Sequence, residues 1–341
     1  MVFVGLGVIL LLVLVVPFVS KKVEHNLEIF LFVMGVAAAI VSGELTKELA
    51  IKALEEPIMI SGAVLIAGLL FRYFQKRIAD GMGKIKERFS YGVLFFCIVA
   101  VLGLASSVIT AIIASLVLVE VVNALKLDRK SEVALDIIAC FSIGLGAALT
   151  PVGEPLATIA ISKLDQEFFY LLKTLGIYII PGILALALFA AFYVKPANSG
   201  RAEKTGGEEE NTKDVVIRAL KVYLFVMALV LLGEGFKPAI DRYVLGLGSE
   251  LLYWINMVSA VLDNATLTAA EISNKMSTQQ ITAILMGLLI SGGMLIPGNI
   301  PNIISAGKLK IGSKEWAKLG VPMGLLIMGV YFVILFFVVN V

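Results

Sequence analysis

Apolar residues gather along this chain in long runs, and most polar and charged residues lie in the short segments between them. A bilayer core about 30 Å thick takes roughly 20 helical residues to cross, so each uninterrupted run predicts one transmembrane helix. These runs cover residues 2–19, 27–41, 57–74, 170–194, 215–233 and 319–341. The remaining apolar stretches are too long for one crossing or are interrupted, and they cover residues 91–125, 133–169, 244–271 and 279–306.

Two of these stretches, 91–125 and 244–271, are expected to be re-entrant hairpins, which enter and leave the membrane on the same side. The first is too long for one ordinary crossing, and small and polar residues occupy its middle at 103–107. The middle of the second, at 259–266, reads Ser-Ala-Val-Leu-Asp-Asn-Ala-Thr. When both stretches are re-entrant, most Lys and Arg residues fall in loops on one side of the membrane, as the positive-inside rule requires.

The other two stretches each contain two prolines with a glycine between them. Residues 149–155 read Leu-Thr-Pro-Val-Gly-Glu-Pro, and residues 295–301 read Leu-Ile-Pro-Gly-Asn-Ile-Pro. Proline removes a backbone donor and clashes with the preceding turn, so both segments should unwind a crossing helix. Unwound backbone at membrane depth is tolerated where it lines a protein cavity, and paired interruptions point to a transporter binding site. The alternative is that each cluster only kinks a packed helix.

These features predict an all-α polytopic membrane protein built as an inverted repeat. Each repeat is expected to contain one re-entrant hairpin and one broken transmembrane helix, in opposite orientations. A polar linker rich in Gly, Glu and Lys separates the two repeats, since it cannot bury apolar area. We expect two N-terminal transmembrane helices in residues 1–56, the first repeat in 57–194, a cytoplasmic linker in 195–214 and the second repeat in 215–341.

Composition and charge narrow the function classes. Of the 341 residues, 59% are hydrophobic and 16% are charged, which excludes a soluble enzyme. The net charge of +2 gives no basic excess for binding nucleic acid. Cys97 and Cys140 lie inside apolar runs, so neither a disulfide nor a metal pair is expected. The single histidine, His25, lies in a polar segment, so no intramembrane histidine chemistry is expected. The stretch nearest to the Gly-x-Gly-Asp motif of an intramembrane aspartyl protease, residues 246–249, ends in serine, so no enzymatic activity is expected.

Two carboxyl groups are expected inside the membrane, Glu154 in the first proline-containing segment and Asp263 in the middle of the second hairpin. An ionised carboxylate at that depth is costly, so such a group usually has a function. If the middle of each hairpin meets a broken helix, both acids share a cavity with hydroxyl and amide side chains. These belong to Ser106, Ser107, Thr110, Thr150, Asn264, Thr266, Asn299 and Asn302.

Oxygen ligands of this kind suit a hard cation such as Na⁺, and carbonyl groups of the unwound segments would complete its coordination. The sequence therefore predicts a cation- and proton-binding site around Asp263, Asn264 and Glu154, with Na⁺ as the transported or coupling ion and no cofactor. Two alternatives stay open: Asp263 and Asn264 only cap a helix, or Glu154 is a packing acid held neutral. Four other acids near span ends are expected to be solvated or to extend toward the membrane surface, namely Glu120, Asp136, Glu234 and Glu271.

Three segments resemble motifs of the ion transporter superfamily, which includes dicarboxylate/sodium symporters, arsenite pumps and NhaD-type sodium/proton antiporters. Residues 146–155 are similar to its first glycine-rich break, and residues 293–302 to its second. Residues 259–264, Ser-Ala-Val-Leu-Asp-Asn, are similar to a hairpin motif of the NhaD-type antiporters. The resemblance extends to a prokaryotic group of proposed cation transporters. It implies a homodimer in the cell membrane, the prokaryotic inner membrane, that works by an elevator-type movement.

The expected function is secondary transport in which Na⁺, or a similar cation, exchanges for H⁺. Protons and the cation would compete for the same carboxylates, chiefly Asp263 and Glu154, and membrane lipid and a small inorganic cation are the expected partners. Every Lys and Arg lies in a loop or near a span end, so no basic side chain is placed to hold an organic anion. The alternative is a Na⁺-coupled symporter of a small anion, or an arsenite-type or neutral-solute carrier.

Overall fold

The chain is a helical membrane protein. The computed structural model describes residues 2–20, 22–23, 26–58, 61–62, 65–66, 69, 90–196, 212–243, 247–261, 264–272 and 276–338, and this part of the chain contains no strand. Its helices α5 (Tyr91–Ile109) and α9 (Tyr170–Tyr193) are long and apolar enough to cross a membrane. The same holds for residues Val215–Ala239 of α10 (Thr212–Tyr243) and for Ser313–Val338. The last span joins α15 (Ser313–Val333) to the π-helical segment η3 (Ile334–Val338).

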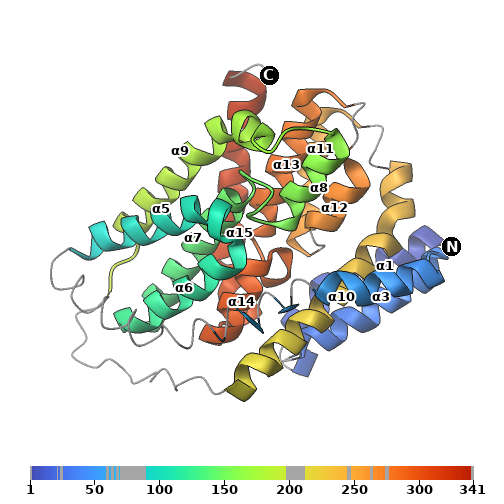
Figure 1. Ribbon diagram of the computed structural model, residues 1–341, viewed down its shortest axis with the longest axis horizontal. Coiled ribbons are helices and arrows are strands. Elements are labelled where there is room, and N and C mark those ends of the chain that lie inside the picture. Colours follow the sequence, from blue (N-terminus) through green and yellow to red (C-terminus); the bar gives the residue numbers. More distant parts are fainter. Residues whose placement is uncertain are drawn as a thin grey trace.

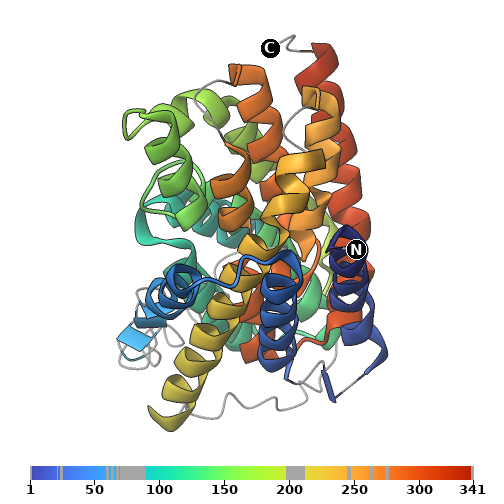
Figure 2. The ribbon, with the colours of Figure 1, turned by 90° about the vertical axis from the view of Figure 1, so that its right-hand side faces the viewer.

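Helices α1 (Val2–Val19) and α3 (Leu27–Ser42) form one group with α10, at the lower right of Figure 1. Figure 2 views this group from its own side, with α10 running along α3. The two helices approach closely because glycine lies at the contact. A methyl group added at Gly35 would lie 2.8 Å from the carbonyl oxygen of Ala228, and one at Gly235 would lie 2.8 Å from the backbone of Ala38. Small residues at such contacts are typical of helices that pack within membranes.

Two ion pairs join α10 to neighbouring helices. Lys221 Nζ on α10 lies 2.9 Å from a carboxylate oxygen of Glu28 on α3. Lys52 Nζ, in the helix formed by residues 47–58, donates a 2.6 Å hydrogen bond to Glu234 on α10. The first pair and the close glycine contacts join α3 to α10, and the second pair joins the helix of residues 47–58 to α10.

The first half of the chain contains a bent helix pair followed by a broken helix. Helices α5 and α6 (Ala111–Leu125) join at Thr110, whose φ of 72° departs from helical geometry. Helix α7 (Arg129–Ala147) then ends, and the chain is irregular until α8 begins (Pro155–Leu164). Proline suits the first position of α8, because its missing N–H has no partner there in any helix.

The second half contains a similar order of elements. Helix α11 (Ser249–Ile255), the 3₁₀ segment η1 (Asn256–Ala260) and α12 (Asn264–Glu271) precede another interrupted helix, and we call them the second bent pair. Helix α13 (Thr278–Gly292) is followed by an irregular segment containing η2 (Ile296–Gly298), and then by α14 (Ile300–Leu309). We refer to residues 148–154 and 293–299 as the first and second breaks.

The two halves are interlocked around α7 and α13. Helix α6 packs on α14, and α8 packs on α12, so the part after each break contacts the bent pair of the other half. Helix α7 also contacts α13, α14 and α15. Every residue of α7 from Ser131 to Ala147 is buried, as is every residue of α13 from Ile281 to Gly292. Both central helices are therefore enclosed by protein on all sides.

The expected position of the first bend was wrong. The chain bends at Thr110 and not at 103–107, which belong to α5. Their small side chains serve helix packing, because a methyl group added at Gly103 would collide with Ser142 of α7, and one at Gly146 with the carbonyl group of Gly103. Ser106 satisfies its hydroxyl group within this contact, donating to the carbonyl oxygens of Gly103 at 2.6 Å and Ile143 at 3.0 Å.

Some of the other sequence expectations agree closely with the observed elements, and others concern residues that the structure does not describe. The first two expected spans match α1 and α3, and the expected breaks both occur. Helix α10 extends further than the expected span 215–233 at both ends. The expected span 57–74 and the linker 195–214 fall mostly outside the described residues.

We expect Gly146→Ala to destabilise the protein by about 1–3 kcal/mol, because the added methyl group meets backbone atoms of α5 that cannot move aside. Thermal unfolding of the purified protein in detergent measures this effect. Gly307→Ala in α14 is the matched control, since nothing lies within 4 Å of its added methyl group. That change should raise stability by about 0.5–1 kcal/mol, and equal destabilisation by both changes would contradict the tight α5–α7 contact.

Candidate functional site

The first break is held against the bend between α5 and α6. Thr150 Oγ1 donates a hydrogen bond to the carbonyl oxygen of Ser107, and the backbone N–H of Ala111 donates to the carbonyl oxygen of Gly153 at 2.9 Å. Thr110 Oγ1 accepts from the backbone N–H of Ile113 at 3.3 Å, which caps α6. The structure therefore brings together four of the expected site residues, namely Ser106, Ser107, Thr110 and Thr150.

The second break meets η1 in a similar way. A methyl group added at Gly298 would lie 2.9 Å from the carbonyl oxygen of Ser259 and 3.0 Å from that of Ala260, so the two backbones are in contact. Asn302 Nδ2 donates to the carbonyl oxygens of Gly292 and Leu295, both at 2.9 Å. This side chain satisfies carbonyl groups that the break removes from helical bonding.

The second break also reaches the first broken helix. Asn299 is 5% exposed, and its Nδ2 atom lies 2.5 Å from the position that a methyl group on Gly144 would occupy. Glu154, 7% exposed, immediately precedes α8, and Asn264, 4% exposed, begins α12. Since α8 packs on α12, these two expected site residues lie at the starts of neighbouring helices, Glu154 just before α8 and Asn264 at the first residue of α12.

Two expected ligands are not described. Asp263 lies outside the described residues, and the side chain of Thr266 is likewise outside the description. The predicted grouping of Asp263, Asn264 and Glu154 around a cation therefore stays a prediction. Within the described residues, no group of three His, Cys, Asp or Glu side chains could hold a metal ion. A cation site formed in this part of the chain would thus combine at most two such side chains with carbonyl, hydroxyl and amide oxygens.

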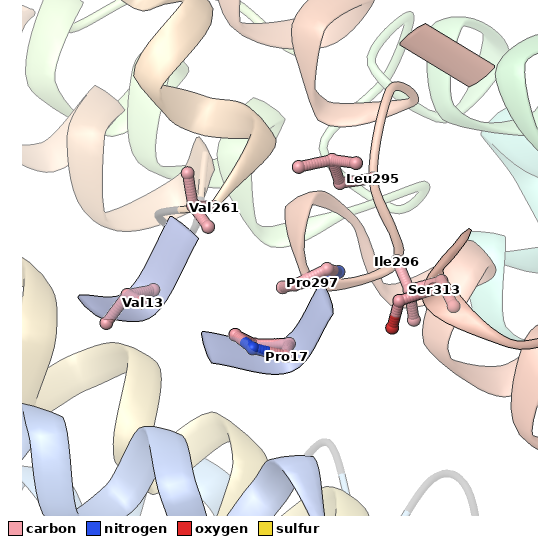
Figure 3. A pocket seen from close by; sticks show the side chains of 7 residues that line it. All are labelled: Val13, Pro17, Val261, Leu295, Ile296, Pro297 and Ser313. Atoms are coloured by element: carbon pink, nitrogen blue, oxygen red, sulfur yellow. The ribbon is translucent and has the colours of Figure 1, made fainter. Parts of the chain in front are cut away.

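A small pocket borders the second break on its α1 side (Figure 3). Its volume of about 10 Å³ is close to the space of one water molecule. Pro17 and Val13 on α1 line it together with Pro297 of η2. Its remaining lining residues are Val261, Leu295, Ile296 and Ser313. Helix α1 thus covers one side of the unwound backbone with apolar side chains.

The expectation that Asp136 and Glu271 are solvated was wrong. Asp136 is fully buried, and its Oδ2 accepts a 2.8 Å hydrogen bond from Ser305 Oγ on α14. Glu271 is 1% exposed, and its Oε2 accepts a 2.9 Å bond from Asn256 Nδ2. The distance of a residue from the end of an apolar run indicates its exposure only when the helix is isolated. Asp136 and Glu271 lie on helices that neighbouring helices cover, so both side chains are buried.

The other two acids of that set are also engaged. Glu120 is 8% exposed and lies 3.6 Å from Lys308 Nζ, which pairs α6 with α14. Glu234 binds Lys52, as described above. The sequence places every basic side chain in a loop or near a span end, and Lys308 lies near such an end, although only 8% of its side chain is exposed. Its position near the end of α14 nevertheless keeps it away from the break that precedes this helix.

Arg129 ties the start of α7 to the end of α14. Its guanidinium group donates to the carbonyl oxygens of Leu309 at 2.8 Å and Lys310 at 2.9 Å. It also binds the carboxylates of Glu132 at 2.6 Å and Glu315 at 2.7 Å. Burial on its own lowers the pKa of Arg129, but the bonds to Glu315 and Glu132 raise it overall. The guanidinium is therefore a fixed positive charge at this end of both helices.

No curated protein matches the chain. A family described as "Protein of unknown function (DUF1646)" matches residues 3–338. The matched range includes both bent helix pairs, both breaks and the helices α1, α3 and α10. Because the match spans nearly all of the sequence, the chain belongs to the DUF1646 family.

Proposed function

We propose that this protein is a secondary transporter that exchanges Na⁺, or a similar cation, for H⁺. One observation carries the proposal. Two helices are interrupted in the protein interior, and each break is held against a bent helix pair. Unwound backbone enclosed by protein at membrane depth is the feature from which transporters build ion sites.

We propose further that the two halves are inverted repeats with re-entrant hairpins. Equivalent hydrogen bonds support this relation. Ser115 Oγ donates to the carbonyl oxygen of Ala111, the first residue of α6, and Thr268 Oγ1 donates to that of Asn264, the first residue of α12. The exchanged packing of α6 with α14 and of α8 with α12 is what a two-fold relation between the halves requires.

The directions of α6 and α14 support a site where these helices begin. Leu116 and Ile304 belong to one apolar cluster, and one turn further Glu120 lies beside Lys308. The two helices are therefore parallel, and both start next to a break. Helices α7 and α13 end at the breaks, where their last carbonyl groups carry partial negative charge. Those carbonyl groups favour a cation.

The proposed coupling is competition between the cation and protons for Glu154 and Asp263. When a cation binds, it displaces the proton from a shared carboxyl group, so only one of the two is carried at a time. Helix starts carry partial positive charge and favour an anion, so α6 and α14 support the alternative of a symporter for a small anion. The two acids favour the cation, because they would repel an anion.

We propose an elevator-type movement in which the bent pairs and the broken helices move as one body, and the remaining helices, among them α1, α3 and α10, form the scaffold. The contact between α10 and the moving part supports this division. It includes an apolar cluster of Leu116, Val222, Val226 and Ile304, which contains no directional bond that sliding would break. A homodimer in the cell membrane stays a prediction of the sequence resemblance.

The inverted arrangement predicts that α7 and α13 start on opposite sides of the membrane. Lys130 and Thr278 are exposed near these two starts, so each can be replaced by cysteine after Cys97→Ser removes the exposed native thiol. A membrane-impermeant thiol reagent should label Lys130→Cys from the cytoplasm and Thr278→Cys from outside. Labelling of both from one side would contradict the inverted repeat.

For transport, we expect an imposed Na⁺ gradient to change the internal pH of proteoliposomes that contain the purified protein. Apparent Na⁺ affinity should weaken as pH falls, since protons then occupy the shared carboxyl groups. An affinity that does not change with pH, or Na⁺ flux that requires an added organic anion, would replace exchange with symport.

Two variants test whether the expected acids, Asp263 and Glu154, are responsible for this exchange. Asp263→Asn should abolish coupled exchange while the protein stays folded. Glu154→Gln should weaken apparent Na⁺ affinity at least about tenfold, because a bond to a charged ligand contributes about 1.5–3 kcal/mol. Asp165→Asn is the matched control, since Asp165 is exposed and its φ of 51° also suits asparagine. If Asp263→Asn exchanges at the wild-type rate, Asp263 is only a turn residue.

A further inference from the structure

A line of polar side chains follows the contact between α7 and α14. On α7, Glu132, Asp136, Cys140 and Gly144 are spaced by one helical turn and share one face. The facing positions run in the opposite direction along α14, because Arg129 binds Leu309, Asp136 binds Ser305 and Gly144 touches Asn299. We call this contact the α7–α14 seam. It connects the charged cluster at Arg129 with the second break.

Asp136 lies in the middle of the seam and is bound only in part. Its Oδ2 accepts from Ser305 Oγ, and Cys140 Sγ lies 3.2 Å from the same hydroxyl group. When Cys140 donates, the three groups form one directed chain from thiol to hydroxyl to carboxylate. Asp136 Oδ1 and Asn302 Oδ1 are buried and have no hydrogen-bond partner among the described residues.

Nearby charges are already engaged with other groups. Arg129 binds Glu132 and Glu315 at the end of the seam, and the Lys308 ammonium group lies beside Glu120 on α6. No ion pair joins Asp136 to a basic side chain within the described ranges. A carboxyl group buried in this way must carry a proton or hold a cation, because an isolated buried charge is very costly.

The donor set favours the proton. A hard metal cation takes about six oxygen ligands, whereas Asp136 and Asn302 offer one unengaged oxygen each in this part of the structure. The Ser305 hydroxyl group already donates to Asp136, and Cys140 supplies sulfur, which is a poor ligand for Na⁺. A proton requires only one oxygen of Asp136, whereas a metal cation requires several oxygen ligands at once.

We propose that Asp136, with Ser305, Cys140 and Asn302, forms a proton-binding site that carries protons along the α7–α14 seam between the Arg129 cluster and the second break. The inference rests on the proposed cation/proton exchange and assigns its proton path. Asp136 gains a proton at the Arg129 end and releases it toward the second break, or the reverse. In each transfer one O–H or S–H bond breaks as another forms, and no electron is transferred. Asp136 thus acts beside the cation site and is not one of its ligands.

Infrared difference spectra of the purified protein between acidic and alkaline pH test proton binding directly. Wild-type protein should show the C=O stretching band of a protonated carboxyl group that Asp136→Asn removes. Ser305→Ala should shift that band, because it deletes the hydrogen-bond donor to the carboxyl group. Glu271→Gln is the matched control, since Glu271 is equally buried and bound to an amide, and the Asp136 band should persist in it.

Flux measurements in proteoliposomes test the path. Asp136→Asn should lose Na⁺-driven proton movement but keep the exchange of Na⁺ for Na⁺, which needs no proton. Identical difference spectra of the wild type and Asp136→Asn, or proton exchange at the wild-type rate in this variant, overturn the inference and leave the proposed function intact. If wild-type protein shows no Na⁺-driven proton flux, the proposed function fails. The Asp136 band then decides alone whether the buried carboxyl group binds a proton, and its absence overturns the site.

Discussion

Every backbone N–H and C=O group at membrane depth must find a partner within the protein, because lipid offers none. Two buried helices are interrupted by breaks, where backbone groups lose their helical hydrogen-bond partners. Other elements of the fold provide partners for these groups. Thr150 donates to Ser107, and Ala111 donates to Gly153, which joins the first break to the bend at Thr110. Asn302 performs the same task at the second break through Gly292 and Leu295.

The same constraint explains where polar side chains lie. Asp136 and Glu271 persist in the interior because Ser305 and Asn256 on neighbouring elements donate to them. Such groups cost more than apolar ones of equal size, so their retention favours a function that needs ionisable or polar atoms. The close approach of helices at Gly103 and Gly146 brings the hydroxyl group of Ser106 to the backbone of α7. At both breaks, close helix packing therefore also provides hydrogen-bond partners for polar groups.

Local chemistry in the sequence predicts much of this fold. The prolines at 151, 155, 297 and 301 identify both breaks, since their effect on a helix does not depend on neighbours. Apolar run length predicts α1 and α3 almost to the residue. The bend at Thr110 was missed because small residues upstream of it resemble a turn but form a helix contact.

The candidate site is harder to predict, because it depends on which helices face one another. Asp136 lies near the start of an apolar run, and the run alone suggests that this position is solvated. The contact with α14 in the structure shows that Asp136 is buried. Its spacing of four residues from Cys140 and eight from Gly144 is the one sequence signal for a shared polar face. The Arg129 cluster likewise needs the ends of α7 and α14 to meet.

The central claim is that a cation and protons compete for buried carboxyl groups next to the breaks. Proton release on Na⁺ addition to purified, weakly buffered protein tests it most directly. The account predicts that Na⁺ binding releases protons near neutral pH and that this release disappears at alkaline pH, where the carboxyl groups are already ionised. Na⁺ binding without any proton release across this range would contradict the account.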